Sequence, residues 1–148
     1  MNRSKEKIIK DLIDGCSISA DTYYGYIKSN WPRIYADFMF IRENTPQNAK
    51  ILDIGGVPPL LSALLRNSEY TDVSIADPFP ANFEGYLKKQ CISAVKMDVL
   101  NGTGELAEDQ YDLVCFNEVV EHLAGNLLTA LERVSKLVSQ NGNLLVTT

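Results

Sequence analysis

Residues 50–60 read Lys50-Ile51-Leu52-Asp53-Ile54-Gly55-Gly56-Val57-Pro58-Pro59-Leu60. A short apolar run that ends in Asp-x-Gly-Gly is typical of a central parallel strand that delivers the chain to a ligand crevice. The stretch therefore predicts a buried strand over 50–54, a tight turn, and a helix over 59–67. Pro59 falls in the first turn of that helix, where a missing N–H costs least.

Strand and helix patterns alternate after this stretch, which predicts parallel strands joined by crossover helices. Further strands are expected at 72–76, 94–97, 111–116 and 143–148, with a loop over 99–110 and helices over 82–90 and 124–139. Asn141-Gly142 is expected to end the last helix, whose apolar stripe is Leu127, Leu131, Val134 and Val138. The predicted fold is α/β: a Rossmann-like doubly wound parallel sheet of five strands.

The N-terminal third predicts helices. Residues 3–14 have apolar residues at helical spacing, and residues 20–43 form a second helical region. Pro32 lacks an N–H and clashes with the preceding turn, so two helices meeting near it are expected. Residues 1–45 are thus predicted as an N-terminal helical cap and residues 46–148 as the core domain. The aromatic residues of the cap either pack against the sheet or form a lid, with Tyr23, Tyr24, Tyr26 or Trp31 facing a ligand.

The composition of the chain excludes several classes of protein. With 14 basic and 19 acidic residues the net charge is −5, which argues against a nonspecific nucleic-acid binder. No apolar run approaches the length of a membrane span, and no signal-peptide core follows the N-terminus. The three cysteines have no metal-ligand spacing, so no metal is expected, and their odd, scattered number fits a reducing cytoplasm. Cys115 is predicted to be a buried small hydrophobe.

Polar residues follow four of the predicted strands, where a parallel sheet of this kind binds its ligand. They are Asp53, Gly55 and Gly56, then Asp77, then Asp98, and finally Asn117, Glu118, Glu121 and His122. Asp77 lies 24 residues after Asp53, near the spacing at which an acidic side chain accepts hydrogen bonds from ribose hydroxyls. The alternative is that Asp77 only initiates the Asp77-Pro78 turn.

The glycine pattern of the first turn argues against a dinucleotide. Counting from Gly55, the other positions of a G-x-G-x-x-G motif are Val57 and Leu60. Pro58 and Pro59 have no N–H groups to offer a phosphate, whereas the carbonyl acceptors of the loop remain. The turn therefore suits a ligand that presents a cation or an amine.

Five segments in this order resemble class I S-adenosylmethionine-dependent methyltransferases over residues 45–148. Ile51-Leu52-Asp53-Ile54-Gly55-Gly56 is similar to the first motif of the family, and Lys96-Met97-Asp98-Val99 is similar to its adenine-contacting segment. The most specific match is Tyr111 to Leu123, whose Glu-Val-Val-Glu-His-Leu is typical of small-molecule methyltransferases of the quinone-biosynthesis type. Asp77 matches the ribose-binding acid, and residues 131–148 resemble the helix and strand that follow in the family.

The resemblance implies a methyl transfer from S-adenosylmethionine to a small-molecule acceptor, with alignment of the reactants as the main catalytic effect. It implies a cofactor site formed by Asp53, Gly55, Gly56, Val57, Asp77, Pro78, Asp98, Val99, Asn117 and Glu118. His122 is either the general base or a tether for its loop. Glu118 and Glu121 carry the same ambiguity, because Glu121 could equally start the next helix.

Two departures from the family pattern leave alternatives open. Val57 and Pro59 stand where the family usually has glycines, so a protein of the same fold that has lost the cofactor and acts as a binding or interaction module is the second hypothesis. The family sheet usually continues with two more strands, without which strand 143–148 is an unpaired apolar edge. The chain is therefore expected to be the N-terminal portion of a longer enzyme, or to cover this edge with a partner chain, as in a homodimer.

Overall fold

The computed structural model describes residues 4–17, 20–123 and 125–148. Five strands form one parallel sheet in the order β3-β2-β1-β4-β5. The strands are β1 Lys50–Ile54, β2 Asp72–Asp77, β3 Ser93–Lys96, β4 Tyr111–Asn117 and β5 Val138–Thr147. The strand order reverses between β1 and β4, which is the switch point where such sheets bind their ligands. The predicted fold class is confirmed.

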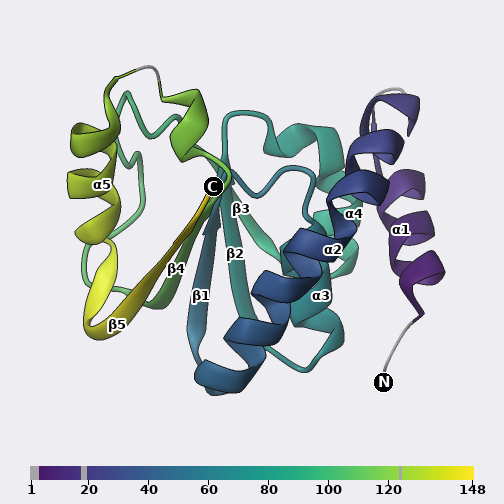
Figure 1. Ribbon diagram of the computed structural model, residues 1–148, viewed down its shortest axis with the longest axis horizontal. Helices are drawn as coiled ribbons and strands as arrows, with labels where there is room; N and C mark the ends of the chain where they lie inside the picture. Colours follow the sequence, from purple (N-terminus) through teal and green to yellow (C-terminus); the bar gives the residue numbers. More distant parts are fainter. Residues whose placement is uncertain (1–3, 18–19, 124) are drawn as a thin grey trace.

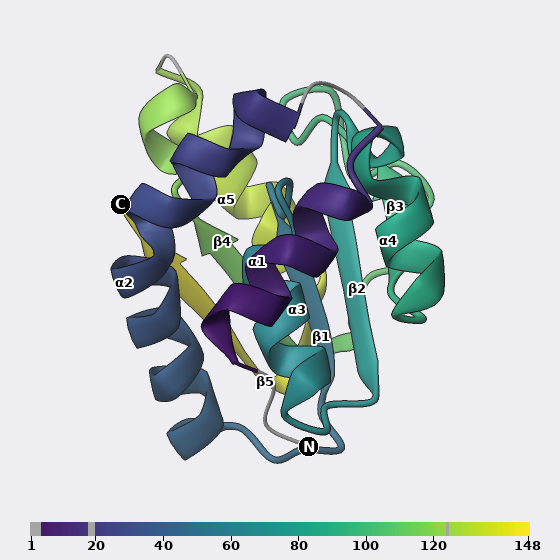
Figure 2. The same cartoon turned by 90° about the vertical axis from the view of Figure 1, so that its right-hand side faces the viewer.

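Helices cover both faces of the sheet (Figures 1 and 2). On one face α1 Lys5–Asp14, α2 Ala20–Asn44, α3 Leu60–Asn67 and α4 Glu84–Lys89 pack in one apolar cluster with side chains of β1 and β2, such as Ile51 and Ile75. On the other face α5 Leu127–Ser135 packs in a second cluster with Leu52 and Val114. Successive side chains of a strand point to opposite faces, so Ile51 and Leu52 serve different cores.

Two short 3₁₀ helices complete the structure, η1 Pro80–Phe83 and η2 Val120–His122. The first four strands match the predicted ranges to within one residue at each end. The predicted helix over 82–90 is η1 followed by α4, and Pro59 is the cap residue before α3. Cys115 is fully buried, as predicted. The predicted helix starts at residues 3 and 124 lie outside the described residues.

Helix α2 is one continuous helix, so the prediction of two pieces meeting at Pro32 was wrong. Pro32 lies inside the helix and on its exposed side. The buried positions Ile27, Trp31, Phe38 and Ile41 form a stripe at helical spacing that runs past the proline without a break. The packing of this stripe against α1 and α3 outweighs the loss of one backbone hydrogen bond.

The end of the chain departs from the prediction in a second way. Helix α5 ends at Ser135 and β5 begins at Val138, so the residues predicted as the last helical turn form a turn at Lys136 and Leu137 followed by strand. Tyr111 pairs with Val138 and Leu113 with Asn143, which leaves extra residues of β5 in a bulge. Gly142 lies in this bulge, where an added Cβ would approach the Tyr111 carbonyl oxygen to 2.6 Å. Asn141-Gly142 therefore marks a bulge and not a helix end.

The apolar stripe predicted for the last helix is right except at Leu127, since Val134 is buried and Leu131 and Val138 pack against the same cluster. Ala130, Val134 and Leu137 are buried, whereas Leu127 is 37% exposed. Among residues 4–17, 20–123 and 125–148, no helix has the length and apolar character needed to cross a membrane.

Candidate functional site

The turn after β1 requires both of its glycines. Gly55 has a φ of +73°, a backbone conformation that side chains rarely adopt, and its N–H donates to the Ala76 carbonyl oxygen at 2.8 Å. A Cβ on Gly55 would lie 2.4 Å from Val119 Cγ2, and one on Gly56 would lie 3.0 Å from Asp53 Cγ. The glycines thus let the turn fold closely over the tips of β1 and β4.

Asp53 is buried beneath this turn. Its Oδ2 accepts a hydrogen bond from the Ser62 hydroxyl of α3 at 3.0 Å. Burial raises the pKa of Asp53 to about 7, against the lowering effect of the Ser62 bond. Asp53 therefore ties β1 to α3 under the site, and Ser62 is a partner that the sequence did not reveal.

Asp77 holds the same turn from the tip of β2. Its Oδ2 accepts the Val57 N–H at 3.2 Å, and its Oδ1 accepts the Phe79 N–H at 2.7 Å. Burial raises the pKa of Asp77, and the two backbone hydrogen bonds oppose that shift. Asp77 therefore holds the turn, as the alternative predicts. It also lines the cleft described below, so ribose binding by Asp77 stays a prediction.

Helix α2 contacts the ends of β4 and β5 beside the site. Arg33 forms an ion pair with Glu118, and Asp37 Oδ2 accepts hydrogen bonds from Asn117 Nδ2 at 3.3 Å and from Thr147 Oγ1 at 3.5 Å. Burial raises the pKa of Asp37, and the charge of Arg33 opposes that shift. Burial and the neighbouring Glu121 carboxyl raise the pKa of Glu118, again against Arg33. Sequence reasoning missed Arg33 and Asp37, although their four-residue spacing puts them on one helix face.

Three polar atoms at this contact are buried and have no hydrogen-bond partner among the described residues. They are Arg33 Nε, Asn117 Oδ1 and Glu118 Oε1. Buried polar atoms are nearly always paired, so each unpaired one requires an explanation. The three supply one donor beside two acceptors.

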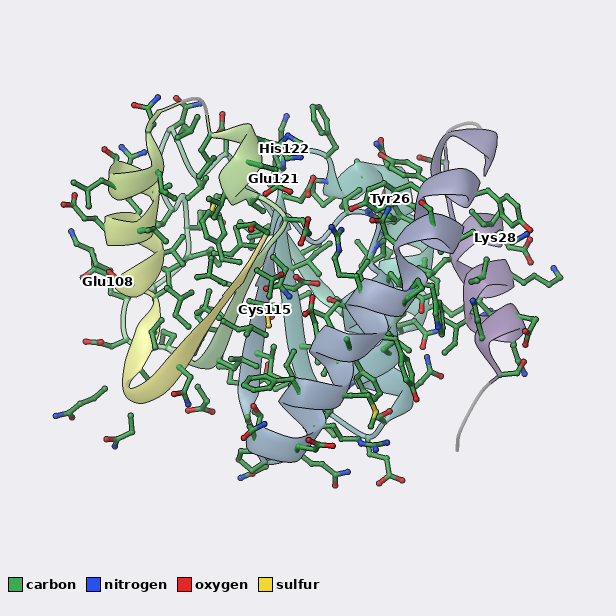
Figure 3. All side chains as sticks on the ribbon, viewed as in Figure 1. Tyr26, Lys28, Glu108, Cys115, Glu121 and His122 are labelled. Carbon is green, nitrogen blue, oxygen red and sulfur yellow. The ribbon has the colours of Figure 1, made fainter. Side chains whose placement is uncertain are left out.

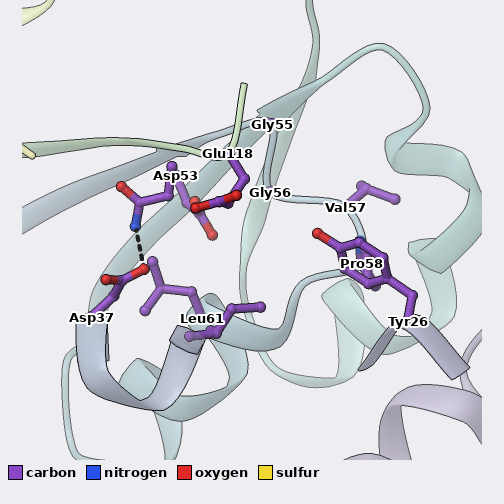
Figure 4. A pocket seen from close by; sticks show the side chains of 11 residues that line it. Tyr26, Asp37, Asp53, Gly55, Gly56, Val57, Pro58, Leu61 and Glu118 are labelled. Atoms are coloured by element: carbon purple, nitrogen blue, oxygen red, sulfur yellow. Dashed lines mark hydrogen bonds between the residues drawn. The ribbon is translucent and has the colours of Figure 1, made fainter. Parts of the chain in front are cut away.

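A cleft lies over the strand tips between α2 and the turn (Figure 4). Its inner end, of about 40 Å³, is lined by Asp37, Asp53 and Leu61, and its outer end, of about 360 Å³, by Asp77 and His122. Both ends share Tyr26, Gly55, Val57, Pro58, Asn117 and Glu118. Residues at the ends of β1, β2 and β4 therefore meet in one cleft.

The remaining predicted site residues lie as follows. Glu121 and His122 stand above the strand tips in η2, and both are exposed (Figure 3). Asp98 is exposed and accepts hydrogen bonds from Leu100 N and Asn101 Nδ2, whereas Val99 is buried in the cluster beneath α5. Neither Asp98, Val99 nor Pro78 lines either end of the cleft.

The aromatic residues of the N-terminal helices divide between two positions. Tyr26 and Tyr23 line the cleft, as a lid would, and the Tyr23 hydroxyl accepts a hydrogen bond from Asn82 Nδ2 at 3.2 Å. Trp31 is buried on another face of α2, and Tyr24 is exposed to solvent. Each of the two readings of the aromatic region therefore fits part of it.

The chain is similar to a known protein family. A family model for a methyltransferase domain matches residues 26–148, from within α2 to the end of β5. A search of curated proteins found no significant match.

Solved structures share the fold at low sequence identity. An S-adenosylmethionine-dependent methyltransferase candidate from Methanococcus maripaludis has a TM-score of 0.64 and 19% identity, over 99% of this chain and 66% of that one. S-adenosylmethionine-dependent methyltransferases from Leishmania major and Archaeoglobus fulgidus have TM-scores of 0.65 and 0.60 with 14% and 19% identity. The alignments cover 95% and 82% of this chain.

This chain spans 59% of the Leishmania protein and 56% of the Archaeoglobus protein. The family model nevertheless covers well over half of this chain. The chain belongs to the methyltransferase-domain family.

Proposed function

We propose that this chain is the cofactor-binding part of an S-adenosylmethionine-dependent methyltransferase that acts on a small-molecule acceptor. The observation that supports this most strongly is the group of unpaired buried atoms at the α2–β4 contact. A donor beside two acceptors complements the carboxylate and ammonium of an amino acid. The methionine end of the cofactor carries both of these groups.

Residues in and beside the cleft can be assigned to the parts of the cofactor. Arg33 Nε would bind the carboxylate, while Asn117 Oδ1 and Glu118 Oε1 would accept from the ammonium group. Asp77 is the candidate for the ribose hydroxyls, since it lines the outer end of the cleft and each of its carboxylate oxygens retains a second lone pair. Asp98 and Val99 are proposed for the adenine by family resemblance alone.

His122 is the candidate general base at the outer end of the cleft. The cofactor supplies a methyl group on a sulfonium, and the protein must hold the acceptor in line with it. A neutral imidazole near the acceptor can take the proton of a hydroxyl or amine as the new bond forms. The small-molecule class of the acceptor is proposed from the resemblance of residues 118–123 to small-molecule methyltransferases.

Calorimetric titration with S-adenosylhomocysteine tests the proposal. We expect saturable heat from the wild-type chain and an affinity lowered about ten-fold by Asp77→Asn, through the loss of charge-assisted hydrogen bonds. Asp72→Asn is the matched control, because Asp72 begins the same strand at the opposite, exposed end. A wild-type chain that gives no heat contradicts the proposal.

A non-catalytic binding module remains the second candidate, and Val57 is the observation that favours it. Its side chain stands where the family usually has glycine, and the residue lines both ends of the cleft. Absence of heat in the same titration, with a folded chain, would favour this candidate.

The open edge of β5 supports a further proposal about partners. Among the described residues β5 pairs with β4 alone, and its Val146 is 40% exposed. Unpaired apolar edges associate readily, so we propose that two copies of the chain can pair along β5.

A further inference from the structure

The helical layer contains a second hollow that shares no residue with the cleft. This helical groove, of about 430 Å³, lies where α1, α2 and the end of α3 meet, on the side of the molecule that faces the viewer in Figure 2. Ser4, Lys5 and Ile8 of α1 and its cap line it, together with Leu64, Asn67 and Ser68 at the end of α3. From α2 it receives Trp31, Tyr35, Phe38 and Arg42.

Aromatic rings form the α2 wall of the groove. Trp31 and Tyr35 stack with ring centroids 6.1 Å apart and an interplanar angle of 14°, and the Tyr35 and Phe38 centroids are 5.7 Å apart. Trp31 and Phe38 are buried, whereas Tyr35 is 41% exposed. Tyr35 is thus the one of these three rings that is exposed, with Trp31 stacked on it and Phe38 tilted against it.

Two cations lie over these rings, Lys5 from α1 and Arg42 from α2. Lys5 Nζ lies 5.1 Å from the Trp31 ring centroid, and Arg42 Cζ lies 5.8 Å from the Phe38 centroid. Of the ten described residues that line the groove, none is Asp or Glu. The described lining of the groove therefore carries two cationic side chains and no carboxylate, in a chain whose net charge is −5.

We propose that the helical groove binds a small planar aromatic anion. Its ring stacks on Tyr35, and its anionic group pairs with Lys5 and Arg42. An aromatic phosphate and an aromatic carboxylate share this chemistry. The proposal is independent of the methyltransferase site, because Trp31, Tyr35, Phe38 and Arg42 lie on a different face of α2 from Tyr26, Arg33 and Asp37.

Phenyl phosphate is the first probe, and Trp31 is its reporter, because it is the only tryptophan of the chain. We expect a saturable change in Trp31 fluorescence at millimolar phenyl phosphate, with an affinity confirmed by calorimetry. Benzyl alcohol and inorganic phosphate should each bind about ten-fold more weakly, because each lacks one half of the recognised chemistry. Equal binding of benzyl alcohol would reduce the groove to an apolar crevice and overturn the proposal. Equal binding of inorganic phosphate would overturn it as well.

Variants locate the binding. Lys5→Gln combined with Arg42→Gln should weaken phenyl phosphate at least about ten-fold, because two charge-assisted contacts are lost. Lys28→Gln is the matched control: Lys28 also lies over a ring, that of Tyr24, but outside the groove, and this variant should bind like the wild type. Arg33→Gln should likewise leave phenyl phosphate binding unchanged.

An unaltered affinity in the Lys5 and Arg42 double variant overturns the proposal, provided that its thermal unfolding matches that of the control. Adenosine monophosphate and benzoate then separate the two sources of the chemistry. Tighter binding of adenosine monophosphate supports a nucleotide, and tighter binding of benzoate supports an aryl carboxylate. If neither of these compounds binds and phenyl phosphate does not bind either, the proposal is overturned. This outcome has no bearing on the cofactor site.

Discussion

The guanidinium of Arg33 in α2 pairs with the carboxylate of Glu118 at the tip of β4, 85 residues away in the sequence. Each partner retains a buried polar atom without a hydrogen-bond partner among the described residues. The pair joins the N-terminal helices to the sheet directly over the proposed methionine-binding end of the cleft. The role of this ion pair in ligand binding can be tested at Arg33.

Arg33→Gln should weaken binding of S-adenosylhomocysteine by about ten-fold or more, because a charged donor to the ligand carboxylate is lost. Calorimetry on the folded variant measures this loss. Arg42→Gln removes the same charge from the same helix outside the cleft and should leave the affinity unchanged. An equal loss in both variants would reduce the effect to general electrostatics.

Stability should depend on pH through Asp53, whose folded-state pKa is raised to about 7 by burial. Between pH ~4 and ~7 the unfolded chain ionises this carboxyl while the folded chain keeps it protonated, so the unfolded state binds fewer protons. The free energy of unfolding should therefore fall as the pH rises through this window and level off above it, with a total effect on the order of a few kcal/mol.

Urea unfolding at several pH values measures this dependence, and Asp53→Asn isolates it. The amide has the shape of the carboxylic acid and can still accept the Ser62 hydroxyl. The free energy of unfolding of the variant should fall less with rising pH than that of the wild type, and above pH ~7 the variant should be relatively more stable. Parallel curves for the two proteins would show that Asp53 ionises normally.

Gly55→Ala should lower the free energy of unfolding by about 2–4 kcal/mol, because a left-handed backbone and a contact with Val119 both oppose the Cβ. Gly104→Ala is the matched control, since Gly104 also has a positive φ, of 60°, but no atom lies within 4 Å of its added Cβ. The control should lose only about 1–2 kcal/mol. Equal losses would mean that Val119 moves aside freely.

Pro32→Ala should raise the free energy of unfolding by about 1–3 kcal/mol, because it restores a backbone donor inside α2 and removes the ring clash. Thermal and urea unfolding measure the change. Gly25→Ala, an exposed site in the same helix, should add about 0.5–1 kcal/mol through helix propensity alone. No gain from Pro32→Ala would show that the helix accommodates the proline without cost.

Val146→Lys should abolish self-association if two copies pair along β5, since a charge on an exposed strand edge prevents pairing. Sedimentation velocity over a range of concentrations measures this. Phe79→Lys, at a residue that is 65% exposed and outside β5, should associate like the wild type. A wild-type chain that stays monomeric throughout would exclude the proposed dimer.

The sheet and the glycine turn were predictable because their signals are local. An apolar run that ends at Asp53, Asp77 or Asn117 specifies both a buried strand and its tip. The bulge at Gly142 was not predictable, because a glycine after a helical pattern equally indicates a helix end. Only the pairing of Tyr111 with Val138 decides between them, and that pairing depends on the neighbouring strand.

The residues of the site at the strand ends were predictable, and those contributed by α2 were not. Gly55 and Glu118 sit at strand tips, where the order of elements alone brings residues together. Through the packing of α2, Asp37 lines the cleft and Arg33 pairs with Glu118 beside it, and the prediction of a break at Pro32 separated both from the residues before it. Whether α2 continues through Pro32 depends on the exposed position of this residue, which is set by tertiary packing.

Helix α2 borders two hollows with different faces, the cleft through Tyr26 and Asp37 and the helical groove through Tyr35 and Arg42. Because one helix lines both sites, a ligand that shifts α2 on binding at one site would change the affinity of the other site for its own ligand. The coupling free energy must then be the same in both directions. Whatever factor an aromatic anion imposes on cofactor affinity, the cofactor must impose on the anion.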